Sequence, residues 1–204
     1  MYKIEKINTK TVFSLINVQK NPSPSPVLSK ESQNRLSKEI NSMSIFVKES
    51  FNEENTHLKF VIQGTGLYEN GLYQLDVQFS KDYPYLPMKI RFDTKILHPN
   101  IDPNTGDIGL NILNQEWSPA LTCEKALLSI QSFLNSPNFE YIFAPVAACE
   151  FNQDKEKFYA VAKEWVTKYA DKRREIDRLM KAGMNENEAI KKLIRCGELN
   201  NIRK

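Results

Sequence analysis

Residues 98–113 read HPNIDPNTGDIGLNIL, and this stretch decides how the rest of the chain is interpreted. It lies inside a connection over residues 94–121 that is rich in Asn, Pro, Asp and Gly. Connections of this length inside a compact domain are usually either functional or disordered. This one also carries eight large apolar side chains, at Ile96, Leu97, Ile101, Ile108, Leu110, Ile112, Leu113 and Trp117. The pattern predicts an ordered, functional loop that packs on a core.

The segment before this loop predicts a helix followed by strands. Ser29 or Ser32 can cap the helix, because short hydroxyl side chains accept hydrogen bonds from the first free N–H groups. Its apolar face is predicted from the spacing of Leu36, Ile40, Met43 and Val47. The period then changes to two in three segments, 58–62, 73–79 and 89–92. We therefore expect an antiparallel meander with one buried face and one face in water.

Helices are predicted again after the loop. Thr122 can cap one of them and Pro145 can open another. The apolar residues expected inside are Leu127, Leu128, Phe133 and Leu134 in the first, and Phe158, Val161, Ala162, Trp165 and Tyr169 in a last amphipathic helix. A helix, strands, a long loop and helices in this order indicate the α+β class.

Two further segments flank the predicted core at residues 29–170. Residues 1–28 comprise a basic, apolar arm and then alternating prolines at 21–26, which form an extended linker. Residues 171–204 predict a tail of two helices, the second of which begins with a capping box at Asn185. Exposed apolar residues on both segments predict that they pack against other protein subunits. These residues are Val12, Phe13, Leu15, Ile16, Ile176, Leu179, Met180, Ile190, Leu193 and Ile194.

Composition argues against several classes of function. The 204 residues are 41% hydrophobic and 26% charged with a net charge of +3, as in one globular domain with extensions. Mixed charges of this kind indicate no nucleic-acid partner, and no apolar run approaches the roughly 20 residues of a membrane span, so no direct membrane insertion is expected. Three separated cysteines and two histidines give no metal-ligand spacing, so no metal and no cofactor is expected. Unpaired cysteines favour an intracellular reducing compartment, while the basic N-terminus leaves a mitochondrial assembly open.

Eight short strings relate the chain to a known family. Over residues 29–170 the chain resembles a ubiquitin-conjugating enzyme domain, and the strings occur in that family's order. They are Arg35-Leu-x-Lys-Glu39, Tyr68-x-x-Gly-x-Tyr73, Asp82-Tyr-Pro-x-x-Pro87, His98-Pro-Asn100, Trp117-Ser-Pro119, Leu128-Ser-Ile-Gln131, Pro137-Asn138, and Glu164-Trp165 with Lys168-Tyr-Ala170. The resemblance implies an N-terminal helix, a four-stranded antiparallel meander, a long active-site loop and C-terminal helices. The resemblance also implies that the protein is located in the cytoplasm or nucleus.

The residue that carries the family's chemistry is absent. The resemblance implies a cysteine after Gly-x-Ile and before Leu-Asn/Asp-Ile-Leu, which accepts ubiquitin as a thioester and passes it to a lysine. Here that position is Gly109, which has no side chain, so we expect no catalytic residue and no enzyme activity. Cys123 follows the helix cap Thr122, where a thiol pKa can be lowered, but we expect it to be a packing residue. Cys149 and Cys196 are also expected to be packing residues.

Asn100 and His98 belong to the same degenerate site. By resemblance Asn100 is the residue that stabilises an oxyanion. Without a thioester no such oxyanion forms, so this role is not used. We expect both side chains to fix the 94–113 loop instead. Residues 102–106 are one residue longer than the family's pattern, which is expected to move this loop.

A partner surface is implied by the same resemblance. Ligases of the RING type grip an aromatic residue after Asp-Tyr-Pro and the loop around Trp-Ser-Pro-Ala, which here correspond to Tyr85, Pro119 and Ala120. Arg35 on the first helix corresponds to a contact with the activating enzyme. The alternatives are that Tyr85 lies flat on its own sheet edge and that Arg35 belongs to a solvated face.

Three functions compete. The first is an inactive conjugating-enzyme fold that serves as a structural or adaptor subunit of a larger assembly. The second is a variant that assists an active conjugating enzyme in building ubiquitin chains, and therefore binds ubiquitin or that enzyme. The third is an active enzyme whose cysteine was replaced by experiment, which a glycine combined with a longer loop disfavours.

Overall fold

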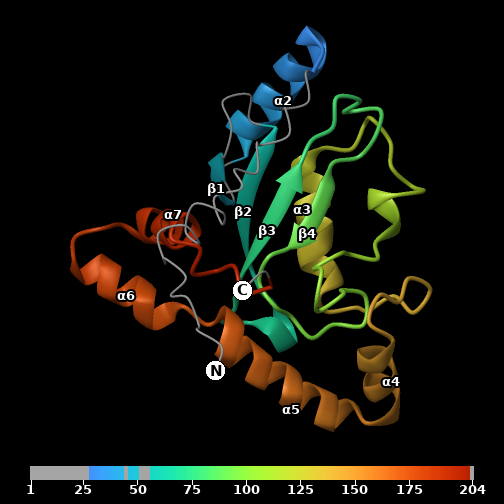
Figure 1. Ribbon diagram of the computed structural model, residues 1–204, viewed down its shortest axis with the longest axis vertical. Coiled ribbons are helices and arrows are strands. Elements are labelled where there is room, and N and C mark those ends of the chain that lie inside the picture. The colour runs from blue at the N-terminus through green and yellow to red at the C-terminus, as the bar shows by residue number, and fades with distance from the viewer. Residues whose placement is uncertain (1–27, 44–45, 51–55, 203–204) are drawn as a thin grey trace, which may run out of the picture.

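The computed structural model describes residues 28–43, 46–50 and 56–202, so the expectations for residues 1–27 lie outside the described part. A helix, α2 (Lys30–Ser42), precedes a four-stranded antiparallel sheet in the order β1-β2-β3-β4 (Figure 1). Its strands are β1 (Val47–Ser50), β2 (His57–Gln63), β3 (Leu72–Gln78) and β4 (Lys89–Phe92). The helices that follow are α3 (Cys123–Phe133), α4 (Pro145–Gln153), α5 (Lys155–Trp165) with the π-helical turn η3 (Val166–Ala170), α6 (Arg173–Lys181) and α7 (Glu186–Arg195). The α+β fold predicted from the sequence is confirmed.

Several predicted helix starts are confirmed by hydrogen bonds. The Ser29 hydroxyl accepts from the Ser32 amide, and the Thr122 hydroxyl accepts from the Lys125 amide. At α7, Asn185 and Glu188 form both hydrogen bonds of a capping box. Each cap satisfies donors that the first turn of a helix leaves free.

The first helix ends earlier than its apolar spacing predicts. Helix α2 stops at Ser42, and Val47 begins β1 instead of continuing the helix. The Lys48 ammonium donates to the carbonyl oxygens of Ile40 and Met43, so a cation from β1 caps the negative end of α2. Val47 follows Met43 by four positions, the spacing of one helical turn, and for this reason the sequence pattern placed it in the helix.

Two apolar clusters lie on opposite faces of the sheet. Leu58, Phe60 and Ile62 of β2 face the main core, which includes α2 and α3. Val61 points the other way and packs in a second cluster against α6 and α7, the two tail helices. In Figure 1 these helices lie beside β1 and β2, away from α3. The expectation that one sheet face meets water is wrong for the part that the tail covers.

The same correction applies to the tail's apolar side chains. Ile176, Leu179, Ile190, Leu193 and Ile194 are all at least 92% buried, so they pack on the chain's own sheet and not against other subunits. Met180 is the exception, at 44% exposed. The tail's apolar face is therefore used within the chain.

Beneath the tail lies a buried group of charges. The Lys59 ammonium bonds Asp76 at 2.6 Å and Asp93 at 2.5 Å, and its side chain is 9% exposed. Arg91 and His57 also bond the Asp76 carboxylate, and hydrogen bonding and charge from these partners lower the pKa of Asp76 far below its usual range despite its burial. The alternation of these polar residues with apolar ones is the reason why the sequence predicted a strand face in water.

The end of the tail is tied to the start of the long loop. The amides of Asn201 and Ile202 donate to the Asp93 carbonyl at 3.0 and 3.1 Å. The Thr94 hydroxyl donates to the Leu199 carbonyl at 2.5 Å. Three residues at the end of the tail thus tie its cover over the sheet to Asp93 and Thr94.

Two findings concern only the described residues. None of their helices is long and apolar enough to cross a membrane. None of their His, Cys, Asp and Glu side chains gather in a group of three that could hold a metal ion.

Candidate functional site

The long loop is ordered by short β-bridges. His98 pairs with Ile101, Ile101 with Ile108, and Asp107 with Arg91 at the edge of β4. The Gly109 amide donates to the Asn100 carbonyl at 2.8 Å. These contacts bring the backbone of Gly109 beside that of Asn100.

Gly109 is buried under the segment that precedes α4. A Cβ atom built on Gly109 would lie 2.6 Å from Cδ2 of Phe143, and closer still to the Tyr141 carbonyl oxygen. The amides of Phe143 and Ala144 both donate to the Pro99 carbonyl, at 3.1 and 2.9 Å, which fixes this segment over the site. The position that the family fills with a nucleophile therefore has no space for any side chain.

The Asn100 side chain is occupied at both ends. Its carbonyl oxygen accepts from the Asn138 amide at 2.9 Å. Its amide nitrogen donates to the Asn138 carbonyl and, at 2.6 Å, to the Tyr141 carbonyl. Asn100 thus ties the 98–101 segment to the 138–141 segment, as expected for a residue that fixes the loop.

We expect Asn100→Ala to lower the free energy of unfolding by about 2–3 kcal/mol, because three hydrogen bonds of about 1 kcal/mol each are lost inside a buried site. Urea denaturation followed by circular dichroism measures the change. Asn114→Ala is the matched control, since Asn114 is exposed and makes one side-chain bond of 3.3 Å. Equal losses in the two variants would contradict the anchoring role of Asn100.

His98 is buried and serves the same loop. Its Nδ1 accepts from the Asn100 amide at 3.1 Å, and its ring lies against the rings of Tyr68 and Phe133. Burial lowers the pKa of His98 to about 3, so the imidazole is neutral at physiological pH. A fully buried imidazole in this position orders the chain and cannot meet a substrate.

The cysteines differ in their surroundings. Cys123 is fully buried at the start of α3, where burial and the nearby Glu39 carboxylate raise the pKa of its thiol. The packing role expected for Cys123 agrees with this position, because a reactive thiol needs access and a lowered pKa. Cys149 and Cys196 are exposed, so their predicted packing roles are wrong. At α4 the inward face consists of Ala147, Ala148 and Phe151 instead.

One prediction about α3 is wrong. Leu128 was expected inside the first helix after the loop, but it is 40% exposed. The inward face of α3 is formed by Ala126, Leu127, Ile130 and Phe133 together with Cys123. Neighbouring Leu residues in a helix point in different directions, so only one of the two reaches the core.

The predicted partner residues lie near one another. The Trp117 indole donates to the Pro84 carbonyl at 2.8 Å, which joins the loop of Tyr85 to the loop of Pro119 and Ala120. Tyr85 is 77% exposed, whereas lying flat on the sheet would have covered it. Pro119 and Ala120 are exposed as well.

Arg35 also reaches this region but is largely used within the chain. It bonds Glu39 at 2.8 Å and the Leu121 carbonyl at 2.9 Å, and its guanidinium lies over the Tyr83 ring. Glu39 in turn accepts from the Tyr83 hydroxyl and the Cys123 amide. The bonds of Arg35 therefore join α2 to the loop that ends at Leu121.

The longer 102–106 segment forms a compact turn. The Asp102 carboxylate accepts from the amides of Asn104 and Thr105 at 2.7 and 3.2 Å. Gly106 has a φ of +76°, a conformation that favours glycine, and its carbonyl accepts from the Phe92 amide. The extra residue is thus accommodated in a turn fixed to β4.

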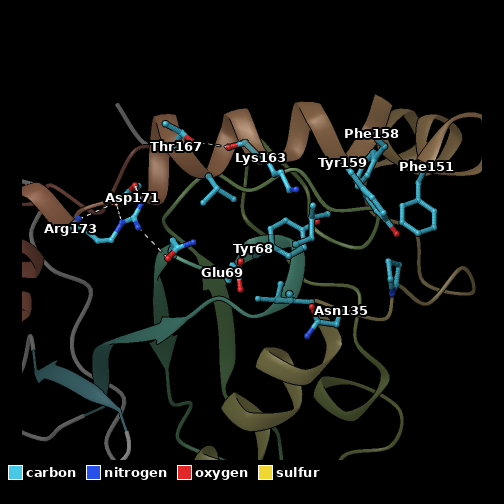
Figure 2. Close-up of a pocket in the computed structure, with 16 residues that line it drawn as sticks. Tyr68, Glu69, Asn135, Phe151, Phe158, Tyr159, Lys163, Thr167, Asp171 and Arg173 are labelled. Atoms are coloured by element: carbon cyan, nitrogen blue, oxygen red, sulfur yellow. Dashed lines mark hydrogen bonds and ion pairs between the residues drawn. The ribbon is translucent and has the colours of Figure 1, made fainter. Parts of the chain in front are cut away.

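The sequence did not indicate two hollows, of which one lies away from the degenerate site and the other borders it at Ile108 and Phe143. One, of about 530 Å³, runs along α5 between Lys163, Tyr159 and the opposing Tyr68 and Glu69 (Figure 2). Arg173 at one end is bonded to Asp171, and aromatic rings form the other end (Figure 2). The second, of about 620 Å³, lies between β4 and the loop and includes Phe143. Both are assembled from residues distant in sequence, so no local pattern reveals them.

Comparison with known proteins places the chain. The family model described as ubiquitin-conjugating enzyme matches residues 27–166. Among solved structures, the E2 domain of a Toxoplasma gondii ubiquitin conjugating enzyme is 37% identical, with a TM-score of 0.65 over 68% of this chain and 98% of that one. A Plasmodium yoelii protein described as a candidate ubiquitin conjugating enzyme is 33% identical, with a TM-score of 0.65 over 71% of this chain and 98% of that one. Since the family model matches well over half of the chain, the chain belongs to the ubiquitin-conjugating enzyme family.

Proposed function

We propose that the chain is an inactive member of this family that acts as a structural or adaptor subunit of a protein assembly. The observation that carries the proposal is the surroundings of Gly109. A thioester needs a thiolate within reach of the incoming carbonyl, and glycine supplies none. The closeness of Phe143 and Tyr141 to any added Cβ supports an old loss of chemistry, since the neighbouring chain is packed against a glycine.

The surroundings of Gly109 also bear on the origin of the glycine. An active enzyme with a replaced cysteine would keep a space that fits the cysteine side chain. Here the amides of Phe143 and Ala144 bond Pro99 and hold the covering segment in place. This packing favours a glycine that is native to the fold over an engineered one.

Exposed apolar residues support a role in binding proteins. Tyr85 and Leu86 are 77% and 53% exposed and lie next to the loop of Pro119 and Ala120. An exposed aromatic residue beside prolines is a suitable anchor for a protein partner. The same surface favours the second candidate function, in which the chain assists an active conjugating enzyme in ubiquitin chain formation.

A charging experiment tests the inactivity. We expect no reducer-sensitive ubiquitin adduct after incubation with activating enzyme, ATP and ubiquitin, read on a non-reducing gel. An ordinary family member serves as the positive control. An adduct that disappears in Cys149→Ser or Cys196→Ser would identify an exposed cysteine as nucleophile and would overturn the proposal.

A second measurement separates the two candidate functions. If the chain is an adaptor, adding it to an active conjugating enzyme and a RING ligase leaves the rate of ubiquitin chain formation unchanged. Stimulation that is lost in Tyr85→Ala would establish the assisting function instead. The variant is a fair test because Tyr85 is exposed and its loss leaves the core intact.

A further inference from the structure

The hollow of about 530 Å³ along α5, named here the α5 hollow, lies away from the degenerate site. One wall is α5 with the π-helical turn η3, and the opposite wall is the short helix η1 (Gly66–Tyr68) with the residues that follow it (Figure 2). The volume falls in the range of small-molecule pockets, roughly 300–1,000 Å³. π-helical turns are rare and frequently occur at functional sites, so η3 is an independent reason to consider this hollow as a binding site.

The walls of the α5 hollow are held in place by hydrogen bonds. The Asn135 side-chain amide donates to the Thr65 hydroxyl at 2.6 Å, which joins the segment after α3 to the residue before η1. At one end of the hollow the Arg173 guanidinium donates to the Asn70 side chain at 3.3 Å and bonds the Asp171 carboxylate at 2.5 Å. The hollow is therefore preformed, and the charges of Arg173 and Asp171 are already used in its structure.

Lys163 and Glu69 supply two further charges of opposite sign to the α5 hollow. Lys163 projects from α5 into the hollow, and Glu69 lies on the opposite wall (Figure 2). Both side chains are exposed, and neither makes an ion pair or a hydrogen bond with any other residue that the structure describes. A ligand that satisfies both side chains has to carry an anionic group and a cationic group.

The far end of the α5 hollow is aromatic (Figure 2). The rings of Phe151 and Phe158 are buried there, edge to face, with their centroids 5.2 Å apart. The Tyr159 ring lies 6.1 Å from that of Phe151 and is 40% exposed. A further aromatic ring can continue this cluster, because aromatic pairs are favourable at centroid distances of about 4.5–7 Å. This end of the hollow therefore favours an aromatic group.

We propose that the α5 hollow binds a small zwitterion that carries an aromatic ring, as an aromatic amino acid does. The ligand carboxylate accepts from the Lys163 ammonium, the ligand ammonium donates to the Glu69 carboxylate, and the ligand ring packs on Tyr159. The internal residues of a protein segment fit less well, because peptide bonds replace their ammonium and carboxylate groups. The inference goes beyond the proposed function, since it holds whether the chain is an adaptor or assists an active enzyme.

NMR titration of the nitrogen-15-labelled full-length protein with phenylalanine tests the proposal. We expect saturable shifts of the backbone amides of Glu69, Tyr159 and Lys163, and none around Gly109. N-acetyl-phenylalanine lacks the ammonium and phenylalanine amide lacks the carboxylate. Each should bind about threefold more weakly than phenylalanine, the effect of losing one ion pair that is partly open to water. Equal affinity for the three probes, or no saturable shift at millimolar concentrations, would overturn the proposal.

Two charge variants assign the binding to these side chains. In Lys163→Met, phenylalanine should bind no better than phenylalanine amide, whose affinity should be unchanged. In Glu69→Gln, phenylalanine should bind no better than N-acetyl-phenylalanine. Lys157→Met and Glu164→Gln are the matched controls, since both residues are exposed on α5 outside the hollow. If Lys163→Met and Glu69→Gln keep the threefold preferences of the parent, the zwitterion binds elsewhere and the proposal is wrong.

Discussion

Gly109→Cys is expected to give a protein that still forms no ubiquitin thioester and is less stable than the parent by about 1–3 kcal/mol, the usual cost of inserting atoms into a packed site. The new Cβ meets Cδ2 of Phe143 and the carbonyl oxygen of Tyr141. The carbonyl belongs to the backbone, which Asn100 holds by a hydrogen bond of 2.6 Å. A thiol can enter only if residues 141–143 move, and a displaced nucleophile is inefficient because errors of about 1 Å are costly in catalysis.

The measurement combines urea denaturation with a charging gel for Gly109→Cys. Gly109→Cys combined with Phe143→Ala is the informative companion, because it removes the aromatic ring and leaves the Tyr141 carbonyl in place. Charging of the single variant at the rate of an ordinary family member would show that only the cysteine had been lost. Charging of the double variant alone would identify the Phe143 ring as the remaining obstacle.

Lys59→Met is expected to lower the free energy of unfolding by about 3–5 kcal/mol, the range observed when one partner of a buried ion pair is removed. Lys59 bonds both Asp76 and Asp93, whose side chains are 0% and 1% exposed. Methionine keeps the length of the side chain but removes the cation that bonds both buried carboxylates. Asp76 retains Arg91 and His57, and Asp93 retains the hydrogen bond from Gln74.

Thermal or urea unfolding of the full chain measures this change. Lys89→Met is the matched control, since Lys89 lies in β4 of the same sheet but is exposed. A double variant, Lys59→Met with Asp93→Asn, should recover part of the lost stability because it removes the buried negative charge that Lys59 bonds in the parent. Equal stability of Lys59→Met and Lys89→Met would show that water reaches the Asp93 carboxylate.

The order of helix, strands, loop and helices could be predicted from the sequence because each element carries a local signal. The capping residues Ser29, Thr122 and Asn185 all start helices as predicted. The loop around Gly109 was also predicted, since its apolar residues require a core. What local pattern could not supply is the position of residues 141–143 over Gly109, because the segments are 32 or more positions apart.

The covered sheet face illustrates the other limit. Lys59, Gln74 and Asp76 alternate with apolar residues, and this pattern predicts a face in water. The three residues can be buried because their polar groups share hydrogen-bond and ion-pair partners. Gln74 and Lys59 both donate to Asp93, and Lys59 also bonds Asp76. Whether polar residues on a strand are wet or mutually satisfied depends on contacts that are distant in sequence, such as those of Leu199 and Asn201 with residues 94 and 95.

Because residues 199–202 bond residues 93–94, the cover over the sheet can be completed only at the end of protein synthesis. Domains fold as the chain leaves the ribosome, and their N-terminal parts emerge first. The sheet can therefore pair while Val61 and the ion group of Lys59 still lack their cover, because α6, α7 and Asn201 are translated more than 100 residues after Lys59. A nascent chain stalled before residue 173 lacks both tail helices, so Val61 and the ion group of Lys59 remain open to water, and exposed apolar surface of this kind makes a partly folded chain prone to aggregation.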